Sequence, residues 1–265
     1  MSLLASVLLI ANCAGPCAQQ KVETQLAELV AAVRSADYRG DRAALDRLDA
    51  MLAKIPDSSL DEYRAYWRGF ARWRRAINGF NETPPPSDLE PDLQAAVGRF
   101  RAALERRPGW IEARLAMVGC LGSLMYLAGD DAGKREKILA DYAAVGKTLQ
   151  ADGPDNPRVL WIIGGLQMWA PKPGGGDPVK AAATMRRGVE CSWREALGGA
   201  APAWAPAWGG PENLMNLAYL YSHGAASNKA AALACAHGAL VAVPEWHYVR
   251  DVLLPQIEAM PEPAK

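Results

Sequence analysis

A spacing that occurs twice constrains the fold of this chain more than any other feature. Each copy has four members, separated by offsets of four, three and five residues. The two copies are Ala96, Phe100, Ala103, Pro108 and Ala232, Ala236, Ala239, Pro244. Offsets of three and four place residues on one face of an α-helix, where small residues let a neighbouring helix approach closely, and proline ends the helix. The spacing therefore predicts closely packed helices at two places in the chain.

Helical periodicity extends over nearly all of the chain. Apolar residues recur at intervals of three and four, and most Gly and Pro residues lie between the periodic segments. No segment shows the sustained alternation of a strand, so we expect no substantial sheet. The sequence predicts about eleven helices, at residues 21–36, 41–55, 60–78, 92–107, 110–128, 134–149, 156–169, 178–197, 212–222, 228–243 and 246–259.

The repeated spacing is that of the second helix of a tetratricopeptide repeat (TPR), and the chain resembles the TPR superfamily over about residues 60–260. In the last full unit, Leu214, Leu217, Ala218 and Tyr221 take the spacing of the first helix. The resemblance implies an all-α solenoid of stacked antiparallel helix pairs, interrupted here by two irregular loops. Such an architecture usually binds a partner and performs no chemistry itself.

The N-terminal segment differs in composition from the rest of the chain. Leu3–Ala11 is an apolar run broken only by Ser6, and small residues and turn formers follow up to Ala18. This pattern is typical of a secretory signal peptide and is too short to span a bilayer, although no Lys or Arg precedes the run. We predict a signal peptide at 1–18, a single helical-repeat domain at 19–265, and an exported, periplasmic protein. The alternative is a buried N-terminal helix.

Cys13 and Cys17 are candidates for a bacterial lipidation site. That signal requires Gly, Ala or Ser directly before the cysteine, and here Asn12 and Pro16 stand there. A lipid-anchored form is therefore disfavoured.

The charge balance argues against several classes of partner. The chain has 29 Lys plus Arg and 29 Asp plus Glu, so nothing attracts nucleic acid or an anionic membrane over long range. No later segment has the eighteen or so uninterrupted apolar residues of a membrane span. Cys120, Cys191 and Cys235 have no CxxC spacing and are expected to be buried thiols. We expect no nucleic-acid partner, no integral membrane span, no metal and no cofactor.

One predicted helix, at 60–78, has two opposite stripes. The first is apolar, and the second consists of Arg64, Arg68, Arg72 and Arg75. Four arginines in line could bind phosphate. Because the net charge is zero, a solvated face is the favoured interpretation.

Residues 154–211 depart from the repeat pattern. They contain an Asn-Pro-Arg helix start at 156–158, a proline break, a triple glycine at 174–176 and a Pro-x-Trp-Gly element at 206–209. Over about 156–221 these elements resemble a group of exported bacterial TPR-like proteins of unassigned function. The resemblance implies an exported helical-repeat protein and supplies no catalytic residues.

The triple glycine could cradle phosphate ahead of a helix. Asp177 and Pro178 follow it in place of the Gly-Lys-Ser/Thr of a P-loop, and they bring a negative charge and remove an N–H donor. We therefore expect a tight corner between helices. Gly164 and Gly165 are expected to permit helix contact.

Aromatic residues of the C-terminal half are the candidate binding residues: Trp161, Trp169, Trp204, Trp208, Tyr219, Tyr221 and Trp246. They would either anchor irregular loops in the core or line a groove for a peptide, sugar or hydrophobic ligand, and the core interpretation is favoured. Trp204 and Trp208 are expected to be the most exposed pair, on a long loop packed against the Gly174–Gly176 corner.

The favoured function is a non-enzymatic binding or scaffold module of the bacterial cell envelope, with a protein or peptide partner. The alternative is a periplasmic small-ligand-binding protein associated with an uptake system, with a deep closed pocket lined by Trp161, Trp169 and Tyr219. Catalysis is disfavoured, because the three histidines lie in no metal-binding spacing and no Gly-x-Ser-x-Gly elbow occurs. A two-carboxylate hydrolase needs no local motif and stays open.

Mass spectrometry of the protein from native cells tests the predicted export. Cleavage after Ala18 gives a mature chain that begins at Gln19, because small residues precede that bond. An intact N-terminus in a cytosolic fraction would contradict the prediction. A diacylglycerol mass on Cys13 or Cys17 would establish the lipid-anchored form instead.

Overall fold

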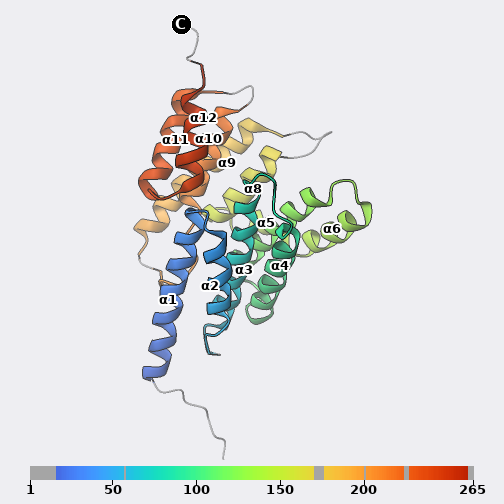
Figure 1. The fold of residues 1–265 in the computed structure, drawn as a ribbon, viewed down its shortest axis with the longest axis vertical. Coiled ribbons are helices and arrows are strands. Elements are labelled where there is room, and N and C mark those ends of the chain that lie inside the picture. The colour runs from blue at the N-terminus through green and yellow to red at the C-terminus, as the bar shows by residue number, and fades with distance from the viewer. Residues whose placement is uncertain (1–15, 57, 170–175, 200, 224–226, 262–265) are drawn as a thin grey trace, which may run out of the picture.

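The computed structural model describes residues 16–56, 58–169, 176–199, 201–223 and 227–261, and no strand occurs in these ranges. The chain forms an all-helical body in which consecutive helices pack against each other in pairs (Figure 1). The helices are α1 (Pro16–Tyr38), α2 (Arg42–Leu52), α3 (Asp61–Gly79), α4 (Leu89–Arg106), α5 (Ile111–Ala128), α6 (Ala132–Gly146), α7 (Leu149–Asp152), α8 (Pro157–Trp169), α9 (Pro178–Leu197), α10 (Gly210–Ser222), α11 (Lys229–Ala242), the π-helical η1 (Tyr248–Leu253) and α12 (Leu254–Glu258). The all-α prediction is confirmed.

The helix boundaries differ from the predicted ones in several places. α4 begins at Leu89, before Pro91, because proline is tolerated in the first turn of a helix. The predicted helix 246–259 is divided into η1 and α12, and α7 is an additional short turn. α1 begins at Pro16, so the predicted signal-peptide boundary falls within this helix, while residues 1–15 lie outside the described part.

The repeated spacing marks buried helix contacts. Ala96, Phe100 and Ala103 on α4 are fully buried, and the ring of Phe100 lies against Gly69 of α3, where an added Cβ would be 2.9 Å from the ring. The alanines of the second copy, at 232, 236 and 239, are fully buried on α11. In both copies the small side chains face a neighbouring helix, as predicted.

α3 lies at the centre of the largest hydrophobic cluster. Its residues Tyr66, Trp67, Phe70 and Trp73 are all buried and contact one another edge to face or tilted. Such contacts between rings add to the gain from removing large apolar surfaces from water. α2, α4 and α5 pack around this helix.

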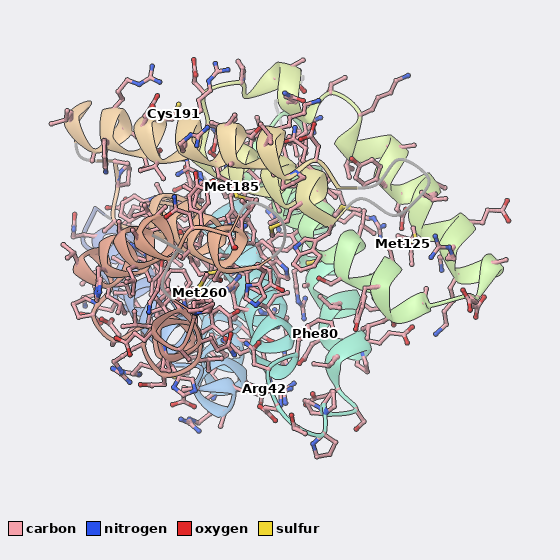
Figure 2. The ribbon with its side chains drawn as sticks, turned by 90° about the horizontal axis from the view of Figure 1, so that it is seen from above. Arg42, Phe80, Met125, Met185, Cys191 and Met260 are labelled. Atoms are coloured by element: carbon pink, nitrogen blue, oxygen red, sulfur yellow. The ribbon has the colours of Figure 1, made fainter. Side chains whose placement is uncertain are left out.

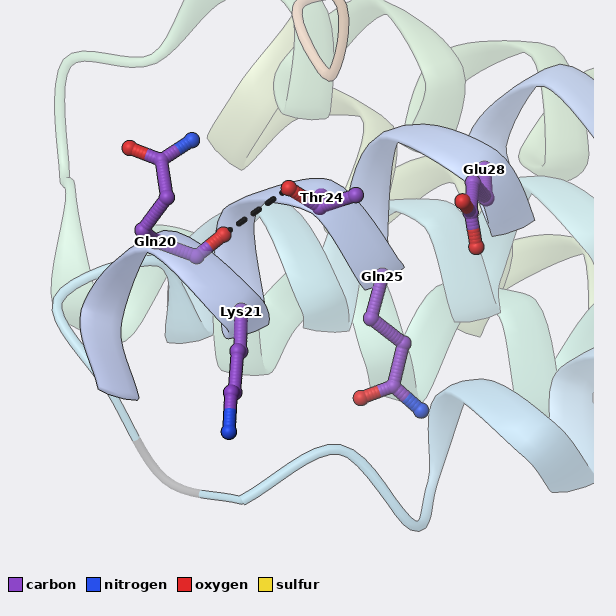
Figure 3. A pocket seen from close by; sticks show the side chains of 5 residues that line it. All are labelled: Gln20, Lys21, Thr24, Gln25 and Glu28. Carbon is purple, nitrogen blue, oxygen red and sulfur yellow. Dashed lines mark hydrogen bonds between the residues drawn. The ribbon is translucent and has the colours of Figure 1, made fainter. Parts of the chain in front are cut away.

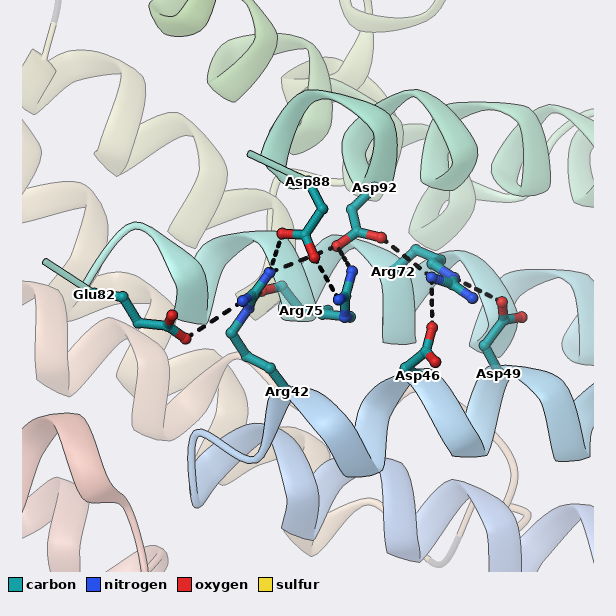
Figure 4. Close-up of polar contacts among 8 residues, drawn as sticks. All are labelled: Arg42, Asp46, Asp49, Arg72, Arg75, Glu82, Asp88 and Asp92. Atoms are coloured by element: carbon teal, nitrogen blue, oxygen red, sulfur yellow. Dashed lines mark hydrogen bonds and ion pairs between the residues drawn. The ribbon is translucent and has the colours of Figure 1, made fainter. Parts of the chain in front are cut away.

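The arginine stripe of α3 is not a solvated face, and that prediction is wrong. Arg64, Arg68, Arg72 and Arg75 are largely buried at their side chains and all pair with carboxylates. The carboxylates that face the last three come from α2 and from the start of α4 (Figure 4). The sequence of α3 alone does not reveal them, because a zero net charge says nothing about which charges meet.

The pairs form a connected network between three helices. Asp49 of α2 accepts from Arg68 Nε and Arg72 Nε, each at 2.7 Å. Asp92 of α4 accepts from Arg72 at 3.2 Å and also from Arg75. Figure 4 shows how Arg42 of α2 closes the network through Asp88. The network therefore clamps α2 and α4 onto one side of α3.

Asp88 stays ionised within this network. Burial acts to raise the pKa of its carboxyl, but the hydrogen bonds and charges of Arg42 and Arg75 outweigh burial and hold the pKa below its usual value. Because the pKa is lowered on folding, the stability that Asp88 contributes is present at neutral pH and is lost as the pH falls through the lowered value.

Removing Asp49 tests the importance of the network. Asp49→Ala removes the acceptor of two largely buried Nε–H groups, those of Arg68 and Arg72, and we expect the free energy of unfolding in urea to fall by about 2–3 kcal/mol. Asp46→Ala is the matched control, because Asp46 also pairs with Arg72 but is 53% exposed at its side chain, and we expect a loss of less than about 1 kcal/mol. Equal losses for the two variants would contradict a structural network.

Candidate functional site

The predicted binding residues fall into a buried group and a surface group. Trp208 and Trp246 are each 3% exposed, and Trp161 and Trp204 are partly buried against the core. Trp169, in contrast, is 63% exposed. A binding role is open to the surface group, whereas the buried group holds the fold.

The expectation that Trp204 and Trp208 form an exposed pair is wrong for Trp208. Its indole Nε1 donates to the Tyr66 hydroxyl at 2.9 Å, and its ring contacts Phe70, Trp73 and Trp161. The backbone carbonyl of Trp204 accepts from Trp67 Nε1 at 2.7 Å. The loop runs along the aromatic side of α3, where burial of these rings removes a large apolar area from water.

This loop contacts α3, while most of the Gly174–Gly176 corner against which it was predicted to pack cannot be compared with it. Gly174 and Gly175 lie outside the described residues. Gly176 approaches the carbonyl oxygen of Met168 so closely that no Cβ would fit, as a tight corner requires. Asp177 then caps α9 by accepting from the Lys180 N–H at 2.9 Å.

The Asn-Pro-Arg and Pro-x-Trp-Gly elements meet in one buried junction. Arg158 donates to Glu195 at 2.7 Å and to the Trp208 carbonyl at 3.1 Å. Gly209 has a φ of +114° and packs on Arg158, where an added Cβ would lie 3.1 Å from the arginine. Glu212 accepts from the Gly209 N–H and from the Tyr38 hydroxyl, each at 2.6 Å. These motif residues therefore join the α8 start, the loop, α10 and α1.

Two further predicted residues point away from the surface group. The Trp246 ring packs edge to face on Tyr38 at 5.0 Å. The Tyr221 hydroxyl accepts from Arg186 of α9 at 2.9 Å.

Of the helix glycines, Gly164 lies against Met185 of α9 as predicted, whereas Gly165 faces open space.

Trp169, Tyr219 and His223 form a set of neighbouring rings, which we call the aromatic patch. Trp169 and His223 are exposed, and Tyr219 is partly buried against the C-terminal cluster. The Trp169 and Tyr219 ring centroids are 5.5 Å apart, and Tyr219 stacks on His223 at 4.1 Å with the planes 15° apart. Tyr248 of η1 is partly buried in the same cluster as Tyr219, and burial raises the pKa of its hydroxyl. The patch therefore joins the ends of α8 and α10 beside η1.

His223 is a patch member that the sequence analysis did not select. It ends α10, and its ring Nδ1 lies 2.9 Å from the Tyr219 carbonyl oxygen and 2.8 Å from the Ser222 hydroxyl. The sequence does carry a signal for His223: it stands four residues after Tyr219, and residues at this spacing share a helix face.

The patch lies outside two surface depressions of the described part. One follows the outer face of α1 and is lined by five exposed residues, Gln20, Lys21, Thr24, Gln25 and Glu28 (Figure 3). The other lies at the start of α8 and includes Asp155, Arg158 and Cys191.

Trp161 packs on Trp73 in the core and not on Trp169. The three residues expected to line a closed pocket therefore do not come together.

Within the described ranges, no group of three or more His, Cys, Asp or Glu residues is placed to hold a metal ion. Cys120 and Cys191 are buried free thiols, and Cys235 is partly buried. α5 is long and apolar enough to cross a membrane by length and composition, and half of it is buried inside the bundle. A core helix of a folded domain passes the same test.

Comparison with protein-family models, with curated proteins and with solved structures finds no match for this chain.

Replacing Trp208 tests its role as a core anchor. Trp208→Ala removes a buried indole and its hydrogen bond to Tyr66, so we expect a loss of about 3–5 kcal/mol in the free energy of unfolding. Trp193→Ala is the control, because Trp193 is 64% exposed on α9 and its loss leaves no cavity. A Trp208 variant as stable as the control would contradict the anchoring role.

Proposed function

We propose that this chain is a non-enzymatic helical-repeat module of the bacterial cell envelope, and that it binds a protein or peptide partner through the aromatic patch. One observation carries the proposal. Most aromatic side chains of the C-terminal half are enclosed, whereas Trp169 is 63% exposed and lies beside Tyr219 and His223. An exposed tryptophan supported by a partly buried aromatic neighbour is typical of the residues that dominate binding energy at protein interfaces.

The repeat spacing supports a TPR-like solenoid. The buried alanines of α4 and α11 face neighbouring helices, and α3–α4, α8–α9 and α10–α11 are consecutive packed pairs. In solenoids each pair contacts mainly its neighbours, which leaves extended surfaces available for binding.

The charged residues of the interior support a structural role for the body. Asp49 and Asp92 pair with arginines of α3, Asp37 pairs with Arg74 at 2.8 Å, and Glu212 caps α10. Each of these groups has a partner that explains its burial without catalysis.

The predicted leader supports the envelope location. The separation of Trp161 from Trp169 favours an open partner surface over the small-ligand receptor, which requires an enclosed pocket.

Affinity capture from an envelope extract tests the proposal. The full chain, Trp169→Ala and Trp193→Ala are used as baits in parallel. The two tryptophans are exposed to nearly the same extent, 63% and 64%, but only Trp169 belongs to the patch. We expect the amount of partner captured by Trp169→Ala to be about tenfold or more below that captured by the unchanged chain. We expect Trp193→Ala to capture as much partner as the unchanged chain.

Two outcomes would contradict the proposal. Equal capture by all three baits would show that the patch does not bind the partner. Recovery of a bound metabolite with no protein would favour the small-ligand receptor.

A further inference from the structure

Charged residues recur at a spacing of seven on both helices of the α3–α4 pair. They are Asp61, Arg68 and Arg75 on α3, and Asp92, Arg99 and Arg106 on α4. Seven residues are about two helical turns, so each set lies along nearly one face of its helix. Figure 2 shows the molecule from above and labels Arg42, at the start of α2, and Phe80, which follows the end of α3.

The two outer levels of this pair of helices join opposite charges. Arg106 Nη1 lies 3.2 Å from Asp61 Oδ2 near the start of α3. Near the other end of α3, Arg75 donates to Asp92, as Figure 4 shows. The start of each helix therefore meets the end of the other, and the two ion pairs fix the register of the antiparallel helices at both ends.

The middle level brings two like charges together. Arg68 and Arg99 stand halfway between the outer pairs, about 10 Å along the helices from each. The next residue on each helix agrees with this register, because a Cβ added to Gly69 would lie 2.9 Å from the Phe100 ring. Burial of part of its side chain lowers the pKa of Arg99, and the charge of Arg68 lowers it further. Two guanidinium groups thus occupy the level where each outer level has an ion pair.

The carboxylates nearby do not compensate these two charges. Asp49 of α2 is the one carboxylate that pairs with Arg68 in the described part of the chain, and its second oxygen accepts from Arg72, each bond being 2.7 Å long. The charge of Asp49 also acts on Arg99, but both oxygens are already engaged. Among the described residues, Arg99 has no carboxylate partner of its own.

The surface around Arg99 leaves the two guanidinium groups accessible. The positions one turn before and after Arg99 on α4 are all alanine, at 95, 96, 102 and 103. A Cβ added to Gly98 would meet no atom within 4 Å. Arg99 is exposed, and the side chain of Arg68 is 19% exposed. No neighbouring side chain of α4 therefore covers this level or supplies it with an acceptor.

We infer that the level of Arg68 and Arg99 is a binding site for a small free oxyanion of the phosphate or sulfate class. Each guanidinium group presents a planar fork of N–H donors, and the two forks come from different helices. A tetrahedral oxyanion has enough oxygens to give each fork its own pair of acceptors, whereas a carboxylate has two oxygens in all. The bound anion completes the middle level as the carboxylates complete the outer ones. The site is distinct from the aromatic patch and does not depend on the proposed function.

The test measures urea unfolding of the full chain at increasing concentrations of sodium phosphate, with sodium chloride holding the ionic strength constant. An anion that binds only the folded chain raises the free energy of unfolding according to its concentration relative to its Kd. Phosphate also stabilises proteins in general, because it is excluded from their surfaces. The comparison between variants separates the two effects, since exclusion acts on all variants alike.

Two alanine variants form the matched pair. Arg99→Ala removes one of the two guanidinium groups, and we expect the apparent Kd for phosphate to rise about tenfold or more, because hydrogen bonds to a charged group are lost. Arg101→Ala is the control, because Arg101 lies on the same helix, is 52% exposed at its side chain and pairs with Asp141 at 3.5 Å. We expect its response to phosphate to equal that of the unchanged chain.

Arg99→Glu tests the like-charge level without any ligand. It places a carboxylate opposite Arg68 and so turns the middle level into an ion pair. We expect this variant to unfold at a higher urea concentration than the unchanged chain in sodium chloride alone, and to lose the specific response to phosphate. Arg101→Glu, which would face Asp141, gains no stability. Circular dichroism shows whether each variant is folded.

Three results would overturn the inference. An equal phosphate response in Arg99→Ala and Arg101→Ala would show that the stabilisation is general. Acetate that stabilises the unchanged chain as strongly as phosphate would assign the site to carboxylates. An Arg99→Glu variant no more stable than the unchanged chain would show that Arg68 and Arg99 do not act on a common group.

Discussion

Helix α3 is enclosed on both of its faces, and its neighbours are held in place by the two kinds of contact that enclose it. Its aromatic side supplies the centre of the main hydrophobic cluster, and its arginine side is paired with carboxylates of α2 and α4. Partly buried guanidinium groups are costly unless each finds an acceptor in good geometry. The arginines therefore fix where α2 and α4 pack, while the rings fix what covers the opposite side.

The aromatic side of α3 is covered by a loop from far along the chain, and this loop joins the two halves of the molecule. Trp208 is inserted among Phe70, Trp73 and Trp161, and its carbonyl is held by Arg158. The same junction reaches α1 through Glu212 and Tyr38. The loop before α10, rich in small residues, prolines and tryptophans, therefore joins the two halves of the molecule structurally. The candidate binding residues are other aromatic residues, at the surface.

The surface aromatic residues follow from the same helix register that builds the core. Trp73 and Ile162 pack on Gly119 in the interior, whereas Tyr126 and Trp169, two turns beyond Gly119 and Ile162, are 77% and 63% exposed. Near the ends of α5 and α8 the neighbouring helices cover less of the side chains, so positions on the same helix faces change from core residues to exposed ones. This geometry explains how one periodic pattern produces both a core and a candidate binding surface.

The amino-acid pattern alone predicted that the chain is helical, roughly where its helices lie, and that the repeated alanines face other helices. These properties are local, because periodicity, caps and breakers act over a few residues. Three further properties became visible only in the folded chain: the arginines of α3 are enclosed, Trp208 is buried, and Trp169 contacts Tyr219, which stacks on His223. Each of these outcomes depends on a partner from a distant segment, such as Asp92 for Arg75 or Tyr66 for Trp208. The residues next to a side chain in the sequence do not specify which distant groups will bury it. Whether it is buried by such groups decides if it is a core residue or is available for binding.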